Sequence, residues 1–462
     1  MTRGFRTICC LCGAALLMVV CGFTPNPSAP MKTDVLVTAT PAYEPLAALA
    51  GGERFPQGAQ IERLHAGKAE PLVAGFAATA DANVSFDAKA VLFAGKKTAG
   101  DPWQIWELAL ADGAVRQLTH GATDAIRPFY LPAGRFLYAV RDVRGYVIES
   151  ARMNDDDKFL DPALPETLAL TYAQASALPD DVLADGRVLF ESGFPLGTAG
   201  SPELYLVYTD GSGVESYRCD HGAARWGGRQ LASGDVVFTH GMALARFTSP
   251  LAHEEAVATP KAEYAGAIAE AAGGLWLVSA RTSKGDAFAL KLWKPGAAAL
   301  TPVFAERGMN LVEPVLVEPR LRPKHHPSAL HPWDYANLLA LDARLSRDGA
   351  LSGTPSKVRV ETQDAAGNAK VMGIAPVEED GSFFVKVPGN TPVRFAVLDA
   401  KGNVLRAERG WFWSSSGEQR ICTGCHTGPE RAAENRVPDV LLRTTISADM
   451  TGKSDANGGL SK

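Results

Sequence analysis

Residues 83–95, NVSFDAKAVLFAG, combine a turn with a short apolar strand, and residues 103–110, WQIWELAL, alternate like a half-buried strand. Ala111-Asp112-Gly113 then provides turn residues, and a last short strand leaves at 115–118. This stretch predicts a compact unit of antiparallel strands.

Similar short apolar strands recur outward from this unit. Their third residues lie at 93, 138, 190, 238 and 277, in steps of 45, 52, 48 and 39 residues. A spacing of about 40–50 residues with only short strands is typical of a four-stranded propeller blade. A glycine precedes most of these strands, which fits turns that need a positive φ: Gly134, Gly186, Gly234 and Gly274. We predict an all-β fold with an N-terminal β-propeller of about six blades over residues 46–320.

The rest of the chain differs in composition. Residues 23–45 are rich in Pro and Thr and predict a linker, and residues 321–354 predict a connector. Residues 355–445 predict a small β-sandwich, because alternating strands are separated by hairpin turns there. Its candidate strands are Val358–Glu361, Ser382–Val387 and Val393–Leu398. Residues 446–462 predict a disordered tail.

The N-terminus predicts export. Arg3 and Arg6 precede an uncharged apolar run, so residues 1–22 resemble a signal peptide. Met18 to Cys21 resemble a lipobox, with Cys21 as the lipidated residue, although Val20 replaces the usual small residue. We expect a protein of the bacterial periplasm or, as a lipoprotein, of the outer membrane, with no membrane contact beyond a lipid anchor.

The charge balance argues against nucleic-acid binding. The 462 residues include 46 Lys and Arg against 51 Asp and Glu, a net charge of −5. A nucleic-acid binder needs clustered positive charge, which this composition does not suggest.

Cys422-Thr423-Gly424-Cys425-His426 has the C-x-x-C-H pattern that attaches c-type haem. Two thiols at this spacing can each add to a vinyl group of one porphyrin, and the next residue presents an imidazole to the iron. Cys422 and Cys425 are thus the predicted attachment residues for one haem c, and His426 is the predicted proximal ligand. The alternatives are a redox dithiol or part of a zinc site completed by connector histidines.

Other residues are candidates for the haem surroundings. The rings of Trp411, Phe412 and Trp413 lie about ten residues before the motif and suit a pocket wall, although packing in the last sandwich strand explains them equally well. The distal ligand is left open between an unligated iron and four candidates: His325, His326, His331 and Met450.

A second cluster lies within the propeller segment. Cys219, Asp220 and His221 together suit metal binding or nucleophilic chemistry, whereas a structural turn with a buried thiol is the simpler explanation.

From Glu313 to Pro438 the sequence resembles the hydrazine synthase alpha subunit middle-domain family, and residues 116–119 (RQLT) resemble TolB-like propeller repeats. The first resemblance is carried by Glu318 to Arg320, His326 to Ser328, Ala375 to Phe383, Trp411 to Trp413, and Cys422 to His426 with Pro429 and Asn435. It implies a propeller followed by a haem-bearing β domain. Hydrazine synthesis needs several electrons, and this sequence has one haem motif, so we expect the fold and the haem without that reaction.

The sequence therefore predicts an exported mono-haem protein. It would transfer electrons with an unidentified redox partner protein, or convert a small molecule at its haem. The alternative is a propeller-based binding or scaffold protein of the cell envelope with a structural haem. A third option, an enzyme centred on the propeller channel, has only the 219–221 cluster in its favour.

Overall fold

The fold is described from a computed structural model of the chain. It describes residues 31–153, 160, 164–172, 175–193, 201–218, 224–346, 349–364, 367–408, 410–424 and 434–452. Across these residues the chain is nearly all-β, as predicted, with one 3₁₀ turn, η1 (Ala47–Ala50), and one short helix, α1 (Asp439–Arg443). In this part of the chain no helix is long and apolar enough to cross a membrane.

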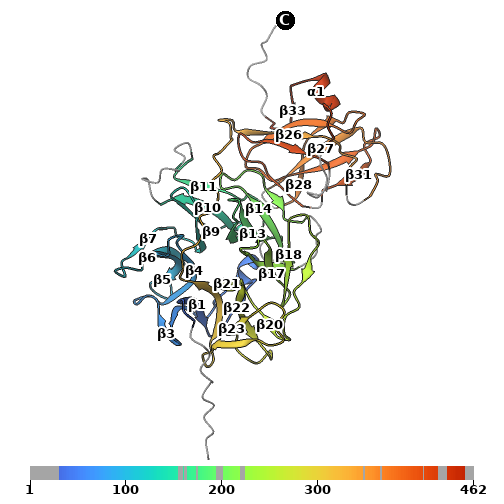
Figure 1. The fold of residues 1–462 in the computed structure, drawn as a ribbon. Coiled ribbons are helices and arrows are strands. Elements are labelled where there is room, and N and C mark those ends of the chain that lie inside the picture. The colour runs from blue at the N-terminus through green and yellow to red at the C-terminus, as the bar shows by residue number, and fades with distance from the viewer. Residues whose placement is uncertain are drawn as a thin grey trace, which may run out of the picture.

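Within the described residues, six antiparallel sheets surround a common centre as the blades of a propeller (Figure 1). The first contains β25 (Asn310–Leu316), β1 (Val35–Thr40), β2 (Gln60–His65) and β3 (Lys68–Pro71). The second contains β4 (Ala78–Val84), β5 (Ala90–Lys96), β6 (Gln104–Ala109) and β7 (Val115–Gln117). The third contains β8 (Ala125–Tyr130), β9 (Arg135–Asp142), β10 (Gly145–Arg152) and β11 (Thr167–Ala169).

The other three sheets follow in chain order. The fourth contains β12 (Ala177–Val182), β13 (Val188–Ser192), β14 (Glu203–Val207) and β15 (Glu215–Ser216). The fifth contains β16 (Arg225–Gln230), β17 (Val236–His240), β18 (Ala243–Phe247) and β19 (Glu255–Ala256). The sixth contains β20 (Glu263–Tyr264), β21 (Ala269–Ala271), β22 (Leu275–Arg281), β23 (Ala289–Trp293) and β24 (Thr301–Phe304).

The first blade joins the two ends of the propeller. β1 pairs with β25, so the ring is closed by strands 270 residues apart, with Thr40 opposite Asn310. The predicted linker over residues 23–45 is therefore wrong for its second half. All six residues of β1 are buried, and this burial makes 35–40 a propeller strand rather than a connection.

The predicted repeat corresponds to one recurring position. The five apolar triplets that define it lie in β5, β9, β13, β17 and β22, the second strand of each blade from the second to the sixth. Their side chains are largely buried between neighbouring blades, which explains the regular apolar signal.

The innermost strands share an irregularity that the sequence did not reveal. Their pairing register shifts near the middle of the strand, as in β4, β8, β12, β16 and β25. At these bulges Asp81, Arg127 and Glu313 have φ of 60°, 51° and 56°. A bulge re-aims a side chain, and here it directs charged groups toward the propeller axis.

The sandwich consists of two four-stranded sheets. One contains β32 (Gln419–Cys422), β26 (Tyr335–Ala340), β29 (Phe383–Pro388) and β33 (Ala448–Asp449). The other contains β28 (Ala369–Pro376), β27 (Lys357–Gln363), β30 (Val393–Leu398) and β31 (Val404–Ala407). The prediction of a disordered tail from residue 446 is wrong for its first residues, because β33 pairs with β29 and Met450 is buried in the core between the sheets.

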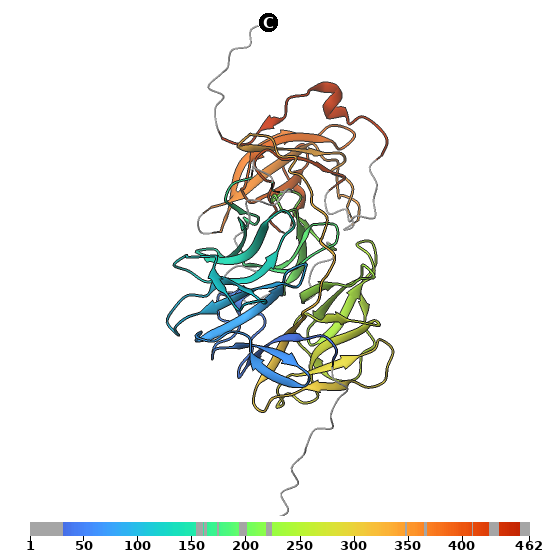
Figure 2. The same cartoon turned by 60° about the vertical axis from the view of Figure 1, so that its left-hand side comes forward.

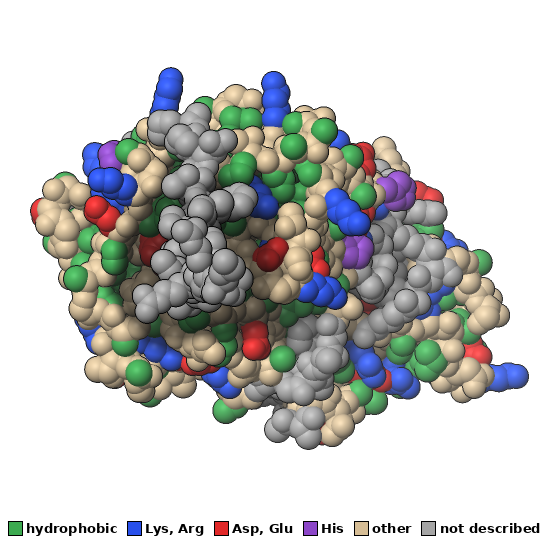
Figure 3. Space-filling model, turned by 90° about the horizontal axis from the view of Figure 1, so that it is seen from below, with side chains coloured by type: hydrophobic (Ala, Val, Ile, Leu, Met, Phe, Trp, Pro, Cys, Tyr) green, Lys and Arg blue, Asp and Glu red, His purple; other side chains and the backbone are tan. Residues whose placement is uncertain are grey.

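The connector crosses the propeller before it reaches the sandwich (Figure 2). The amide of Arg320 donates to the carbonyl of Phe86 at 3.0 Å, and the amide of Lys324 donates to the carbonyl of Ala184 at 3.1 Å. Farther along, Ser328 Oγ donates to Asp210 Oδ2 at 2.9 Å. The surface seen in Figure 3 mixes basic and acidic side chains without a patch of one sign.

Candidate functional site

The strand that leads into the C-x-x-C-H motif is an edge strand of the sandwich. β32 pairs with β26 in parallel, with Cys422 beside Ala340, and the amide of Leu341 donates to the carbonyl of Cys422 at 2.9 Å. Paired residues of neighbouring strands point to the same face of a sheet. Cys422 therefore faces the inner side of the sandwich at its open edge, whereas Ile421 points outward and is 66% exposed.

Several predicted site residues lie outside the described residues. They are Cys21, Cys219, Asp220, His221, Cys425 and His426. The described residues include the motif as far as Gly424. Cys422 is therefore the motif cysteine whose surroundings can be described.

The Cys422 thiol is affected by burial and by a nearby cation. Burial raises its pKa above the ordinary value, although the nearby Arg420 guanidinium acts in the opposite direction. The residue is itself partly exposed. These surroundings suit a haem-attached cysteine and a dithiol equally, so both interpretations of the motif stay predictions.

The three aromatic residues before the motif do not form a single wall. Trp411 stacks under the Arg394 guanidinium at 4.7 Å, and the Phe412 ring packs 5.4 Å from Phe395 in the sandwich. Trp413 is buried against the propeller, with its ring 6.2 Å from that of Tyr172. Phe412 and Trp413 thus pack the sandwich core and the interface between propeller and sandwich.

The four distal-ligand candidates are scattered. The ring nitrogen Nε2 of His326 lies 2.5 Å from the carbonyl oxygen of Asp185 on the propeller, and His325 is a half-buried neighbour in the connector. The His331 ring stacks on Trp333 at 4.3 Å. Met450 follows β33, at the opposite edge of the sheet from β32.

Of these candidates, His331 lies beside the segment that leads into β32. Its amide donates to the carbonyl of Gly417 at 3.0 Å. The structure does not bring the four candidates together, and each ligand role stays a prediction.

Two side chains that sequence reasoning missed attach this strand to the propeller. Glu418 accepts hydrogen bonds from the amides of Gly213 at 3.1 Å and Ser415 at 2.7 Å. Arg420 donates to the carbonyl of Val214 at 2.6 Å and to that of Trp413 at 3.3 Å. Burial raises the pKa of Glu418 despite the nearby arginine. Residues 418–422, EQRIC, do not alternate between polar and apolar, so no local pattern identifies these two side chains as interface residues.

Polar atoms next to this attachment lack partners. Trp413 Nε1, Ser414 Oγ and Ser415 Oγ are buried and have no hydrogen-bond partner among the described residues. Buried polar atoms without partners are rare in folded proteins and call for an explanation such as a ligand or water. A haem brings two carboxylates, which are the acceptors that such donors need, so these residues fit that group.

A small cavity lies where the motif begins. It is lined by Leu341, Asp342, Leu345, Thr423, Arg436 and Pro438, among others. The lining also includes Glu434, and Arg436 is already paired with Glu434 at 3.0 Å and with Asp380, so the described lining of this cavity offers no free cation for a carboxylate.

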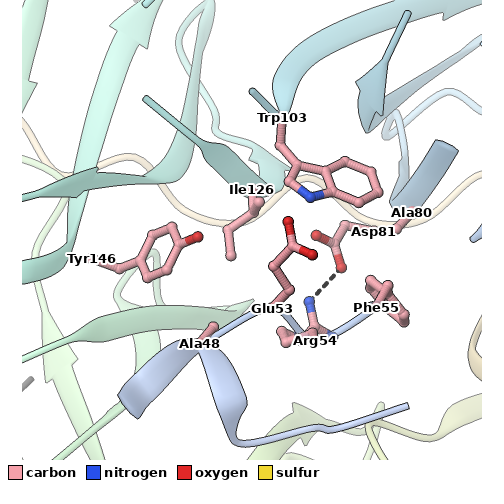
Figure 4. A pocket seen from close by; sticks show the side chains of 9 residues that line it. All are labelled: Ala48, Glu53, Arg54, Phe55, Ala80, Asp81, Trp103, Ile126 and Tyr146. Atoms are coloured by element: carbon pink, nitrogen blue, oxygen red, sulfur yellow. Dashed lines mark hydrogen bonds and ion pairs between the residues drawn. The ribbon is translucent and has the colours of Figure 1, made fainter. Parts of the chain in front are cut away.

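A second buried polar group closes the propeller axis. Arg54 pairs with Asp81 at 2.6 Å and also with Glu313, and its side chain points into a small pocket with Trp103 and Tyr146 (Figure 4). Burial would raise the pKa of Glu313, but the two guanidinium groups of Arg54 and Arg127 outweigh it and lower that pKa to about 2.

Arg127 extends this group to the fourth blade. It bonds Asp180 at 3.0 Å and Glu191 at 2.8 Å, and all three side chains are at most 8% exposed. No local pattern indicates this group, because its charges come from strands far apart along the chain. Paired charges thus line the axis, and a cavity beside them is bordered by Asp81, Arg127, Asp180 and Glu313.

Residues 341–427 match the family model described as the hydrazine synthase alpha subunit middle domain. A structure of hydrazine synthase from Kuenenia stuttgartiensis is similar with a TM-score of 0.74 at 17% identity, over 90% of this chain and 71% of that chain. The predicted resemblance is confirmed. The middle-domain match includes the complete C-x-x-C-H motif at 422–426. At this identity the structural likeness shows the fold alone.

Other solved structures resemble the propeller more weakly. TolB from Acinetobacter baumannii has a TM-score of 0.44 at 14% identity, over 63% of this chain and 68% of that one. A puromycin-hydrolyzing peptidase from Mycobacterium tuberculosis has a TM-score of 0.39 at 17% identity, over 55% and 43%. Both scores are too low to support a statement about function. A search of curated proteins gave no significant match.

Proposed function

We propose that this chain is an exported haem c protein that carries one haem on Cys422 and Cys425, with His426 as the proximal iron ligand. The observation that carries the proposal is the position of the motif, at the end of edge strand β32 in a domain that matches the hydrazine synthase alpha subunit middle domain. The unpartnered donors of residues 413–415 support it, because a haem would supply acceptors for them.

When bound, the haem supplies a one-electron redox centre or a place for small-molecule chemistry. In this proposal the residues of the chain hold and orient it. Arg420 and Glu418 fix the strand against the propeller, and Ile421 keeps an exposed apolar side chain beside the motif. Electrons would pass to a separate redox protein. The N-terminal 22 residues support a periplasmic or outer-membrane location, with Cys21 as lipid attachment point.

The second candidate is a scaffold or binding protein of the cell envelope with a structural haem. It is favoured by the paired charges of Arg54, Asp81, Arg127 and Glu313, which tie the inner strands of the propeller together and leave its outer surface for interactions. Both candidates share the haem and differ in whether it changes oxidation state during function.

The test is expression with c-haem maturation machinery, followed by the reduced pyridine haemochrome spectrum. We expect a covalent c-type signal that disappears in the Cys422→Ala/Cys425→Ala variant. Absence of this signal under conditions that mature a known cytochrome would contradict the proposal. If a small redox mediator neither reduces nor reoxidises the haem-containing protein, the result would favour the second candidate, a scaffold protein with a structural haem.

A further inference from the structure

Three consecutive side chains at the interface between propeller and sandwich present polar atoms without partners. Trp413, Ser414 and Ser415 are 4%, 0% and 3% exposed, and Nε1 of the first and Oγ of the other two lack hydrogen bonds within the described residues. A buried hydroxyl or indole N–H without a partner loses the hydrogen bonds it makes with water in the unfolded chain. Three in sequence point to something that binds there.

The backbone around these atoms is satisfied. The carbonyl of Ser414 accepts the amide of Asn390 at 2.8 Å, and the amide of Ser415 donates to Glu418 at 2.7 Å. The Trp413 ring is held by the propeller core. The segment is therefore fixed by its own contacts, and only its side-chain donors are left without acceptors. Such preorganised donors are typical of a ligand site.

The protein's own acceptors nearby are already used. The Glu418 carboxylate accepts the amides of Gly213 and Ser415, and the Trp413 carbonyl accepts a bond from Arg420. Arg420 itself donates to two carbonyl oxygens and has no direct ion pair within the described chain. A ligand that suits this place carries acceptors, and a negative charge on it would be attracted by the guanidinium.

We propose that Trp413, Ser414 and Ser415 form the hydrogen-bonding site for the carboxylates of the haem. This inference rests on the proposed function. A porphyrin carries its carboxylates on the edge opposite the vinyl groups, so their donors must lie away from the cysteines. Three strand steps of about 3.3 Å separate Gln419 from Cys422, and residues 413–415 lie beyond the start of that strand.

The decisive experiment compares each donor variant in two forms of the full chain, one made with haem maturation and one made without it. Ser414→Ala and Ser415→Ala are measured by urea unfolding. In the haem-free chain we expect an unchanged or higher midpoint, because an unpartnered buried hydroxyl is removed. In the loaded chain we expect a lower midpoint, because a hydrogen bond to the haem is lost. The shift of the urea midpoint thus has opposite signs in the two forms. The difference between the two shifts measures the coupling between the side-chain donor and the haem.

Ser416→Ala is the matched control, because Ser416 is the next serine and is only half-buried. It should shift both forms equally. Trp413→Phe keeps a six-membered aromatic ring but removes the five-membered ring with its Nε1 donor. The lost packing should lower the midpoint of both forms, and the loaded chain should lose more because it also loses the hydrogen bond to the haem.

The haem itself gives a second readout. Loss of the donors leaves the haem carboxylates more negative, and this charge favours ferric iron. The reduction potential of the haem should therefore fall. The propionate-bending bands in resonance Raman spectra should also shift. Unchanged potential and bands and zero coupling in all three variants overturn this inference, and the orphan atoms then hold ordered water only. A chain that attaches no haem at all overturns the proposed function instead.

Discussion

Arg420 of β32 donates a hydrogen bond at 2.6 Å to the carbonyl of Val214 in the fourth blade of the propeller. The two residues are 206 positions apart, and the same guanidinium stacks on Phe412 at 5.3 Å. The strand that carries Cys422 is thus fastened to the propeller as well as to its own sheet. The propeller thereby fixes where the motif lies.

Arg420→Met should loosen this attachment. The methionine keeps the apolar stem over Phe412 but leaves two carbonyls without their charged donor. Hydrogen bonds to charged groups are worth about 1.5–3 kcal/mol, so we expect a loss of that size in urea unfolding of the haem-free chain. Arg443→Met is the control, because its side chain is 62% exposed, and it should change stability by about 0.5 kcal/mol or less. Equal effects of the two variants contradict a role of Arg420 at the interface.

Two strands of the sandwich were predictable because turn residues bound them, although β29 pairs with β26 and β33 rather than in a hairpin. The strand predicted at 393–398 is β30 itself, and the one predicted at 382–387 differs from β29 by one residue at each end. Alternation and turn residues are local signals, so a single sequence carries them.

The first blade and the axis were not predictable in the same way. β1 finds its partner β25 some 270 residues later, and no local pattern encodes that pairing. Asp81 and Arg127 look like surface residues in the sequence, yet both are buried because distant segments supply their partners: Arg54 for Asp81, and Asp180 for Arg127. The attachment of Arg420 to Val214 depends on the packing of two domains, which composition does not show.

Glu62 on β2 should make stability depend on pH. Burial and the nearby Glu306 carboxylate raise its pKa from 4.5 to about 7. A raised carboxyl pKa stabilises the fold below pH 4.5, and this contribution is lost as the pH rises through 7. Since the side chain is partly exposed, we expect a loss of no more than about 1 kcal/mol after solvent screening.

Glu62→Gln should flatten this part of the profile. Urea midpoints measured from pH 4 to pH 8 would fall with pH in the wild type and stay level in the variant. Glu70→Gln on neighbouring β3 is the control, because Glu70 is exposed, and it should retain the wild-type slope. A Glu62→Gln profile as steep as that of the wild type contradicts the prediction.

Arg127 holds the charges at the propeller axis together. Its removal by Arg127→Met leaves the buried carboxylates of Asp180 and Glu191 without their cation. Breaking a buried ion pair from one side costs about 3–5 kcal/mol, which we expect at pH 7. The loss should shrink toward pH 5, because burial raises the pKa of Asp180 and protonation then removes a charge.

Arg116→Met tests whether any lost ion pair has this effect. Arg116 pairs with Glu107 at 2.6 Å, but its side chain is 56% exposed, so the cost should be no more than about 1 kcal/mol. If Arg127→Met and Arg116→Met lower the free energy of unfolding by similar amounts, the charges at the axis do not stabilise the propeller.

Alanine substitutions at Gly186 and Gly234 distinguish the effect of backbone strain from the effect of contact with the connector. Both occupy the same kind of turn, with φ of 92° and 93°. A Cβ at Gly186 would overlap the carbonyl oxygen of Lys324 in the connector, whereas a Cβ at Gly234 would meet open space. Alanine at either position therefore adds similar strain, and only Gly186→Ala displaces the connector.

We expect Gly186→Ala to cost about 1–3 kcal/mol more than Gly234→Ala in urea unfolding, the usual penalty of overpacking. It should also expose the chain after Lys324 to trypsin, because the amide of Lys324 is held by the carbonyl of Ala184 only while the connector is seated. Peptide mapping after brief digestion measures this directly. If the two variants are equally stable and equally resistant, seating of the connector does not depend on close packing between Gly186 and Lys324.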